Sequence, residues 1–183
     1  MKSFRSFILN EQALSDDKHV HRIDKTKISD FSSEMKTYQH NSDWTESGML
    51  KKGETPEKGW KTSIGVFATD SHSVAPYAAP RNIKWISYDK NGKWQLIFDK
   101  KDEKKIEENR YVISSFPKER FKYIKTSGEY FSEDPGVPVI QNTIENPVKF
   151  MQKHGHTVRF VPDIDKYKKD LEKNNIEHNS EGF

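Results

Sequence analysis

Three stretches of the sequence place side chains with chemical capability near the ends of predicted strands. These stretches read "TYQHNS", "GVFATDSHSVAPYA" and "SGEYFSED". They supply an imidazole at His40, aromatic rings at Phe67 and Tyr77, and carboxylates at Glu129 and Glu133. An imidazole and aromatic rings can position a ligand, and a carboxylate can stabilise a positive charge that develops during a reaction. These five side chains are therefore candidates for one functional site.

Several other chemistries lack the motifs that they need. The chain has no Cys, which excludes a thiolate zinc site, a Cys nucleophile and a disulfide. "NGKW" lacks the glycine pattern of a Walker phosphate loop, and neither Gly-x-Ser-x-Gly nor His-Glu-x-x-His occurs. His19 and His21 have no adjacent carboxylate pair, which favours solvated histidines over metal ligands. His154 and His156 in "KHGHTVRF" indicate the end of a helix.

The composition describes a folded chain with a large solvated surface. Hydrophobic residues make up only 32% of the 183 residues, but eleven Phe, seven Tyr and four Trp indicate a core built on aromatic rings. The net charge of +3 arises from 31 basic and 28 acidic residues mixed along the chain, which is weak support for a nucleic-acid partner. No apolar run approaches the roughly 20 residues that span a bilayer, so we expect no membrane partner.

The elements that must hold the candidate side chains are mostly strands. Runs of β-forming residues predict strands over 36–40, 62–68, 83–88, 94–99, 110–116, 121–124 and 129–131. Asn91-Gly92 predicts a two-residue hairpin turn, and Gly65 predicts the close approach of another backbone. Residues 41–60 read as a long irregular loop, which is typical of a functional or disordered segment.

Helix signals become frequent towards the C-terminus. N-cap residues stand at Asp70 or Ser71, at Thr143 and at Asp163, and Gly155 ends the second of these helices. Pro76 limits the first helix to a turn or two. The strand "TVRFVP" separates the last two helices. We therefore predict a strand-rich α+β domain with a mixed or antiparallel sheet, closed by a helix, a strand and a helix.

The stretch "GVFATDSHSVAPYA" resembles the second motif of the ADP-ribosyltransferase superfamily. In the poly(ADP-ribose) polymerase branch that motif runs Gly-hydrophobic-Tyr-Phe-Ala-Asp and continues to Ser-x-x-Tyr in the next helix. The corresponding residues, which follow the motif with small offsets, are Gly65, Val66, Phe67, Ala68, Asp70, Ser73 and Tyr77. An earlier strand with His40 and a later strand that begins Glu129-Tyr130 agree with the family order. The resemblance covers about residues 36–141 and implies an ADP-ribosyltransferase-like fold.

The resemblance also implies a substrate and roles for the candidate residues. NAD would be cleaved at its nicotinamide glycosidic bond, with His40 positioning the ribose and Phe67 or Tyr77 stacking on nicotinamide. Glu129 would bind a ribose hydroxyl and activate the acceptor, with Glu133 as a rival. Two positions depart from the family: Asn41 replaces the Gly whose backbone meets the nicotinamide amide, and Phe67 replaces a Tyr. A fold that had lost activity would show the same departures.

The N-terminus "MKSFRSFILNE" is a short amphipathic peptide with Phe4, Phe7 and Ile8 on one helical face. A first helix that packs on its own domain is one interpretation. The peptide also resembles the capsid-targeting peptide of internal head proteins in T-even-type tailed phages, which ends in Leu/Ile-x-Glu. Leu9 and Glu11 match that site, and the resemblance implies cleavage after Glu11 by the prohead protease.

Together these interpretations give an expected organisation and two functions. Residues 1–11 would be a propeptide, 12–35 a polar arm or short helices, and 36–183 the α+β domain. The protein would lie inside the virion head, meet capsid scaffold or protease during assembly, and enter the host cytoplasm with the DNA. There it would act on a host target as an ADP-ribosyltransferase-like enzyme, or alternatively block a host restriction or defence factor without catalysis.

Overall fold

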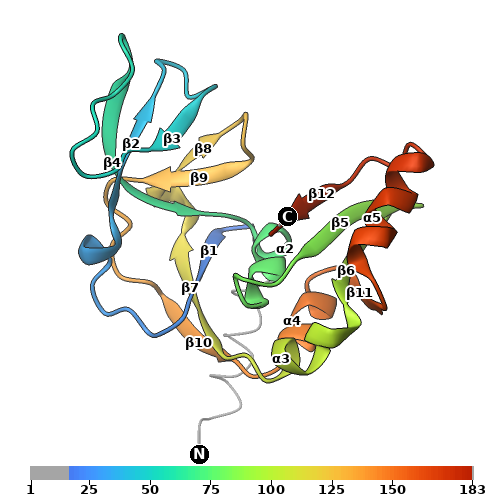
Figure 1. Ribbon diagram of the computed structural model, residues 1–183. Helices are drawn as coiled ribbons and strands as arrows, with labels where there is room; N and C mark the ends of the chain where they lie inside the picture. Colours follow the sequence, from blue (N-terminus) through green and yellow to red (C-terminus); the bar gives the residue numbers. More distant parts are fainter. Residues whose placement is uncertain (1–16, 183) are drawn as a thin grey trace, which may run out of the picture. The chain divides into compact units, whose positions relative to one another are not determined.

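The computed structural model describes residues 17–182, which fold into two compact units (Figure 1). Unit 1 contains residues 17–71 and 112–142, and unit 2 contains 72–111 and 143–182. Antiparallel strand pairs predominate and the helices are short, so the chain has the predicted strand-rich α+β character. The sequence predicted one domain over 36–183, whereas the structure has two units, each built from two chain segments.

Unit 1 contains a five-stranded antiparallel sheet with the order β3-β2-β4-β9-β8. Its strands are β2 (Lys36–His40), β3 (Ser47–Met49), β4 (Lys61–Ala68), β8 (Lys122–Ile124) and β9 (Glu129–Ser132). Four of them confirm predicted strands to within a residue or two. The short strand β3 lies inside the segment 41–60 that the sequence described as a loop.

Gly65 explains how β4 can carry an aromatic cluster on one face. A Cβ at this position would overlap the carbonyl oxygen of Ser132 and lie 2.6 Å from the Phe131 ring. Both of these groups belong to the neighbouring strand β9, so the predicted close approach at Gly65 is confirmed. The Phe131 ring occupies the space that a side chain would fill, next to Phe67 on the facing position of β4.

A second sheet in the described chain has the order β1-β7-β10, with β1 (His19–Asp24), β7 (Tyr111–Pro117) and β10 (Ile140–Ile144). Strand β1 lies where the sequence favoured a polar arm or short helices. Val20 and His21 of this strand are almost completely buried, and β1 pairs antiparallel with β7. Val20 packs with Phe31 and Phe116 in the hydrophobic core of unit 1. The segment therefore belongs to the folded unit.

Unit 2 is built on a four-stranded sheet with the order β11-β6-β5-β12, in which β11 and β6 are parallel. The strands are β5 (Trp85–Lys90), β6 (Lys93–Asp99), β11 (His156–Val161) and β12 (Asn179–Glu181). Asn91 and Gly92 both have positive φ between β5 and β6, as the predicted hairpin turn requires. Leu96, Ile97 and Phe98 are all fully buried, so both faces of β6 are covered.

Short helices surround this sheet (Figure 1). They are α2 (Ser71–Val74), the 3₁₀ turn Ala75–Ala78, α3 (Glu103–Glu107), α4 (Pro147–Lys153) and α5 (Ile164–Lys173). Helix α5 packs Ile164 and Leu171 on Ile86 and Ile97 of the sheet. None of the helices within residues 17–182 is long and apolar enough to cross a membrane.

Of the two helix caps that were predicted after residue 140, one is wrong. The Asp163 carboxylate accepts from the Lys166 N–H and begins α5, as predicted. Helix α4 is capped by Asn146, whose side-chain oxygen accepts from the Lys149 N–H, and not by Thr143. Thr143 lies in β10, and Pro147 fits the first turn of α4 because its missing N–H would have no helical partner there.

Candidate functional site

One of the candidate residues, Glu133, lines a hollow of about 400 Å³ in unit 1, which we call the Trp44 pocket. Its lining residues are Trp44, Ser63, Arg120, Lys122, Phe131, Ser132, Glu133 and Asp134. Aromatic rings form its floor, and charged side chains of both signs form its rim. The elements that supply it are the loop after β2, the middle of β4, and the β8–β9 region.

The loop 41–46 holds Trp44 in the pocket floor. Trp44 has φ of +60°, and its N–H donates to the Asn41 carbonyl. The Asn41 side chain donates to the Thr45 hydroxyl and accepts from the Glu46 N–H. This arrangement leaves Trp44 only 6% exposed and packs its indole on Phe131, with ring centroids 4.8 Å apart. Asn41 therefore stabilises the loop through these hydrogen bonds. The sequence had predicted only a role for this residue near nicotinamide.

His40 lies beneath Trp44 at the end of β2. The two rings stack with centroids 3.7 Å apart and planes at 12°. The imidazole Nδ1–H donates to the Asn41 carbonyl at 2.7 Å, and Nε2 accepts from the Ser63 hydroxyl at 3.2 Å. His40 is 4% exposed. Both ring nitrogens are therefore engaged within the protein, and the imidazole supports the pocket from below.

The two aromatic candidates lie in different units. Phe67 is half-buried and packs edge-on against Tyr38, with centroids 4.7 Å apart, in the same cluster as Trp44 and Phe131. Tyr77 belongs to unit 2, where its ring is 50% exposed and meets Trp85 edge-on at 6.1 Å. Phe67 thus packs in the aromatic cluster that includes Trp44 and Phe131, and Tyr77 belongs to unit 2.

The two candidate carboxylates occupy different places along β9. Glu133 follows the strand and lines the Trp44 pocket beside Asp134. Glu129 begins the strand, and its parity places it on the same face as Phe131. Although Glu129 is exposed, the nearby protein raises its pKa by desolvation, and a hydrogen bond with Ser127 acts in the opposite direction. Glu133 is the candidate carboxylate that reaches the pocket.

The rim carries four exposed charges that the sequence did not group together: Arg120, Lys122, Glu133 and Asp134. Within residues 17–182, none of these four forms an ion pair within 4 Å. The Ser132 hydroxyl donates to the Arg120 carbonyl and accepts from the Asp134 N–H, which fixes the two rim segments together. The Lys122 ammonium lies 5.8 Å from the Trp44 ring. Hydrogen bonds of Ser132 thus hold the backbone of the rim, and its four charged side chains form no ion pairs within the described residues.

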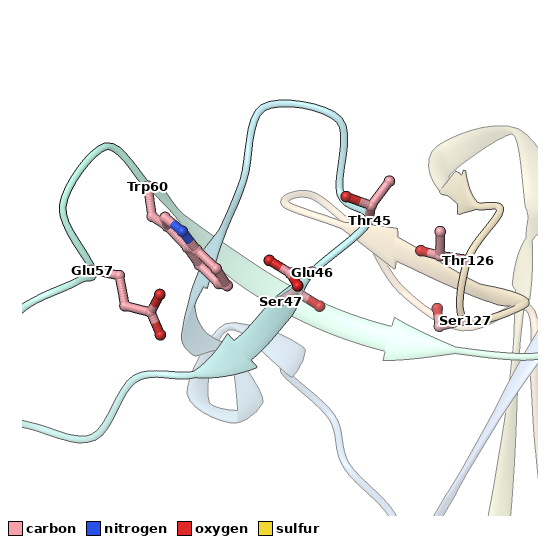
Figure 2. Close-up of a pocket in the computed structure, with 7 residues that line it drawn as sticks. All are labelled: Thr45, Glu46, Ser47, Glu57, Trp60, Thr126 and Ser127. Atoms are coloured by element: carbon pink, nitrogen blue, oxygen red, sulfur yellow. The ribbon is translucent and has the colours of Figure 1, made fainter.

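A second hollow of about 530 Å³ lies in the same unit and is shown in Figure 2; we call it the Trp60 pocket. It is lined by Thr45, Glu46, Ser47, Glu57, Trp60, Thr126 and Ser127. Figure 2 shows Glu57 and Trp60 on one side, Thr126 and Ser127 on the other, and Glu46 between them. The Glu57 N–H donates to the Gln39 side chain at 2.8 Å, and the Thr126 hydroxyl donates to the Trp44 carbonyl at 2.8 Å.

Sequence reasoning did not single out Trp44 or Trp60. The available signal was their position, because both lie in the polar segment 41–60, where a large apolar ring needs a specific reason. Arg120 and Lys122 gave no such signal in a chain with 31 basic residues. Their role depends on the return of β8 and β9 to the loop after β2, which is a tertiary feature.

Leu9 and Glu11 of the N-terminal peptide lie outside the described residues. Among the described residues, no group of three or more His, Cys, Asp or Glu side chains is placed to hold a metal ion.

No protein-family model, curated protein or solved structure matches this chain. The site is therefore characterised by its own geometry.

Proposed function

We propose that this chain is a phage internal head protein whose body acts in the host as a binding protein, engaging a host protein through the Trp44 pocket. The observation that carries this choice over the enzyme is the state of His40. Its ring is buried beneath Trp44, and both ring nitrogens already have partners in Asn41 and Ser63. An imidazole in this position supports a binding surface.

The same observation bears on NAD. To hold a ribose, His40 would have to leave its stack on Trp44 and give up one of two buried hydrogen bonds, and each broken bond leaves an unsatisfied polar group. The engaged state of His40 therefore opposes the ribose-positioning role that the family resemblance assigns to it, and we derive no reaction step from NAD.

The Trp44 pocket has properties that favour a protein partner. Its rim presents two cationic and two anionic side chains that form no ion pairs within the described chain, so each can pair with an opposite charge on another molecule. Its backbone is fixed by strands β4, β8 and β9. Complementary charges around a partly apolar centre are typical of specific, rapidly formed protein complexes.

Charge reversal tests the binding function. Tagged full-length chain is exposed to a lysate of the host, and the captured proteins are compared with those held by an Arg120→Glu/Lys122→Glu variant. Lys51→Glu/Lys52→Glu is the matched control, because these exposed lysines lie outside the pocket. We expect a host protein that the wild type and the control retain and the pocket variant loses at least tenfold. Equal capture by all three chains would contradict the proposal.

NAD calorimetry on the full-length chain separates binding from catalysis. We expect no heat of NAD binding, because His40 is engaged. NAD binding by the wild type would overturn the non-enzymatic choice.

The enzyme is the second candidate, and one specific observation favours it. His40, Phe67 and Glu133, which lie far apart in the sequence, all border the Trp44 ring or its pocket. If the chain does cleave NAD, Glu133→Gln is expected to abolish the turnover and Glu129→Gln to leave most of it. The opposite ranking would remove Glu133 from the site.

Delivery with the phage has a test of its own. Mass spectrometry of purified particles is expected to find a chain that begins at Gln12, as cleavage after Glu11 requires. A packaged chain that retains Met1 would contradict the targeting-peptide interpretation while leaving the binding function standing.

A further inference from the structure

Unit 2 contains a compact cluster of three histidines that the proposed function does not use: His72 of α2, His154 at the end of α4, and His156 of β11. We call it the histidine cluster. The rings of His72 and His156 stack with centroids 4.1 Å apart and planes at 10°. The His72 Nδ1–H donates to the His154 carbonyl at 2.9 Å, and the His156 Nε2–H donates to the His72 carbonyl at 2.9 Å. The cluster thus joins three elements.

Two nitrogens of the cluster are buried without a hydrogen-bond partner. His156 is 5% exposed and His154 is 9% exposed. Because Nε2 of His156 donates to the His72 carbonyl, its Nδ1 carries no proton in the neutral ring, and this Nδ1 is one of the unpartnered atoms. The other is Nε2 of His154. A proton added to Nδ1 of His156 would create a buried N–H with no acceptor beside the His72 ring, and a doubly protonated His154 would carry such an N–H at Nε2.

We propose that the histidine cluster is an acid-sensitive latch that closes α2, α4 and β11 together at neutral pH and releases them in mild acid. The backbone makes the latch tight, since Gly155 lies between two of the histidines with φ of +94°. A Cβ there would lie 3.1 Å from Nδ1 of His72. A doubly protonated His154 or His156 needs a further acceptor, and the described residues place none at the two unpartnered nitrogens.

The electrostatic surroundings favour the neutral rings. Burial lowers the pKa of His154 to about 4, and Lys153 of the same helix, His156 and His72 act in the same direction. Burial also lowers the pKa of His156, which the hydrogen bond to the His72 carbonyl partly opposes and the charge of His72 reinforces. From β6 the neighbouring ring is Trp94, and from α4 it is Phe150, both uncharged.

No carboxylate within residues 17–182 compensates for a proton on His154. The 3₁₀ turn Ala75–Ala78, which packs on α4, carries no charged side chain. Helix α3 also packs on α4, but its charged residues Glu103, Lys104, Lys105 and Glu107 do not contribute to the pKa of His154. Lys153 is therefore the charged side chain with the largest effect on the pKa of His154, and its positive charge opposes protonation.

The pH window follows from these directions. A histidine whose folded pKa lies below its ordinary value of 6.5 stabilises the closed state fully above pH 6.5, and this contribution is lost as the pH falls from 6.5 towards 4. We take the pKa of His154 as 6.5 when the latch is open and about 4 when it is closed. Lowering the pH from 7.5 to 5 then raises the equilibrium constant for opening about 30-fold through His154 alone. His156 acts in the same direction.

Hydrogen exchange on the full-length chain at pH 7.5 and pH 5, corrected for the intrinsic pH dependence of exchange, tests the latch. We expect the opening constant of peptides from 71–78 and 147–161 to rise about 30-fold or more, while β2, β4 and β9 of unit 1 change much less. His154→Phe is expected to remove most of this rise. His178→Gln is the control, because His178 lies in the same unit but faces Glu172. Acid loosening of both units alike would overturn the proposal.

A measurement on the unaltered chain covers the case in which His154→Phe does not fold. Nuclear magnetic resonance follows the ring signals of each histidine as the pH is lowered. We expect His154 and His156 to take up protons only together with the loss of native signals from α2, α4 and β11. Protonation of both rings near pH 6.5 with native signals retained would contradict the latch.

Discussion

His40 in unit 1 and His156 in unit 2 are both buried, and both stack face to face on a neighbouring ring, yet they are satisfied differently. His40 stacks on Trp44 and has a partner for each ring nitrogen. His156 stacks on His72 and has a partner for Nε2 but none for Nδ1. The two buried imidazoles therefore differ in whether both ring nitrogens have hydrogen-bond partners within the protein.

The neighbouring ring adds to this difference. Trp44 is an uncharged aromatic surface that can stabilise a cation through its π face, and Lys122 already lies near it. His72 is a base that can itself become charged, so a proton on either stacked ring of unit 2 opposes a proton on the other. The two stacked histidine rings therefore differ in the chemical nature of the neighbouring ring and in their hydrogen-bond partners.

Removing Trp44 is expected to have the largest effect on the buried histidine of unit 1. Trp44→Ala deletes the ring over His40 and the centre of the cluster with Ile124 and Phe131, and Trp44 is 6% exposed. A loss of about 3–5 kcal/mol in the free energy of unfolding is expected for such a truncation. Urea unfolding followed by hydrogen exchange would locate the loss in unit 1. Trp60→Ala, at a less buried ring, is the control, and equal losses in both would contradict the account.

Gly65 tests the support beneath the same stack. Gly65→Ala places a methyl group against the Ser132 carbonyl and the Phe131 ring, which packs on Trp44. Overpacking of this kind is expected to reduce the free energy of unfolding by about 1–3 kcal/mol. Gly48→Ala is the matched control, since a Cβ there meets nothing within 4 Å and its φ is not in the left-handed region. Thermal unfolding of the two variants gives the difference.

Periodicity and turn chemistry were sufficient to predict much of the fold. The hairpin at Asn91-Gly92, the cap at Asp163 and the close approach at Gly65 depend on local residue types, and the structure confirms all three. Strand β1 was missed because its sequence "HVHRID" has only two apolar residues. Its burial depends on partners far along the chain, such as the 2.9 Å hydrogen bond between His21 and Ser115.

The candidate site shows the same limit. The sequence named His40, Phe67 and Glu133, and the structure brings them to Trp44, a residue that the sequence passed over. Conversely, it described His154 and His156 as a helix end. That description is correct for the backbone, since α4 ends at Lys153. Whether a ring nitrogen has a partner is decided by packing between elements, and no spacing within the sequence encodes it.

Ser63 offers a way to make the histidine of unit 1 resemble that of unit 2. Ser63→Ala removes the hydroxyl that donates to Nε2 of His40 and leaves this buried nitrogen without its partner, as Nδ1 of His156 already is. The lost hydrogen bond is expected to reduce the free energy of unfolding by about 1 kcal/mol. Urea unfolding at neutral pH measures it. Ser47→Ala, at an exposed position, is the control, and equal effects would show that Ser63 does not support His40.

The smallest expected effect concerns the alkaline side of unit 2. Burial, followed by the hydrogen bond between the Tyr88 and Tyr167 hydroxyls at 2.7 Å, raises the pKa of Tyr88 to about 12. A Tyr with a raised folded pKa stabilises the fold fully below pH 10, and this contribution is lost as the pH rises from 10 towards 12.

Tyr167→Phe removes the weaker of these two causes, so the pKa of Tyr88 is expected to fall only in part, because burial remains. An ultraviolet titration of the phenolate band measures this change, with Tyr123→Phe as the control at a ring that is 53% exposed. An unchanged Tyr88 titration would show that the hydroxyl pair does not influence its ionisation. A lowered pKa, together with the acid latch, would mean that unit 2 is limited by its side-chain ionisation at both ends of the pH range.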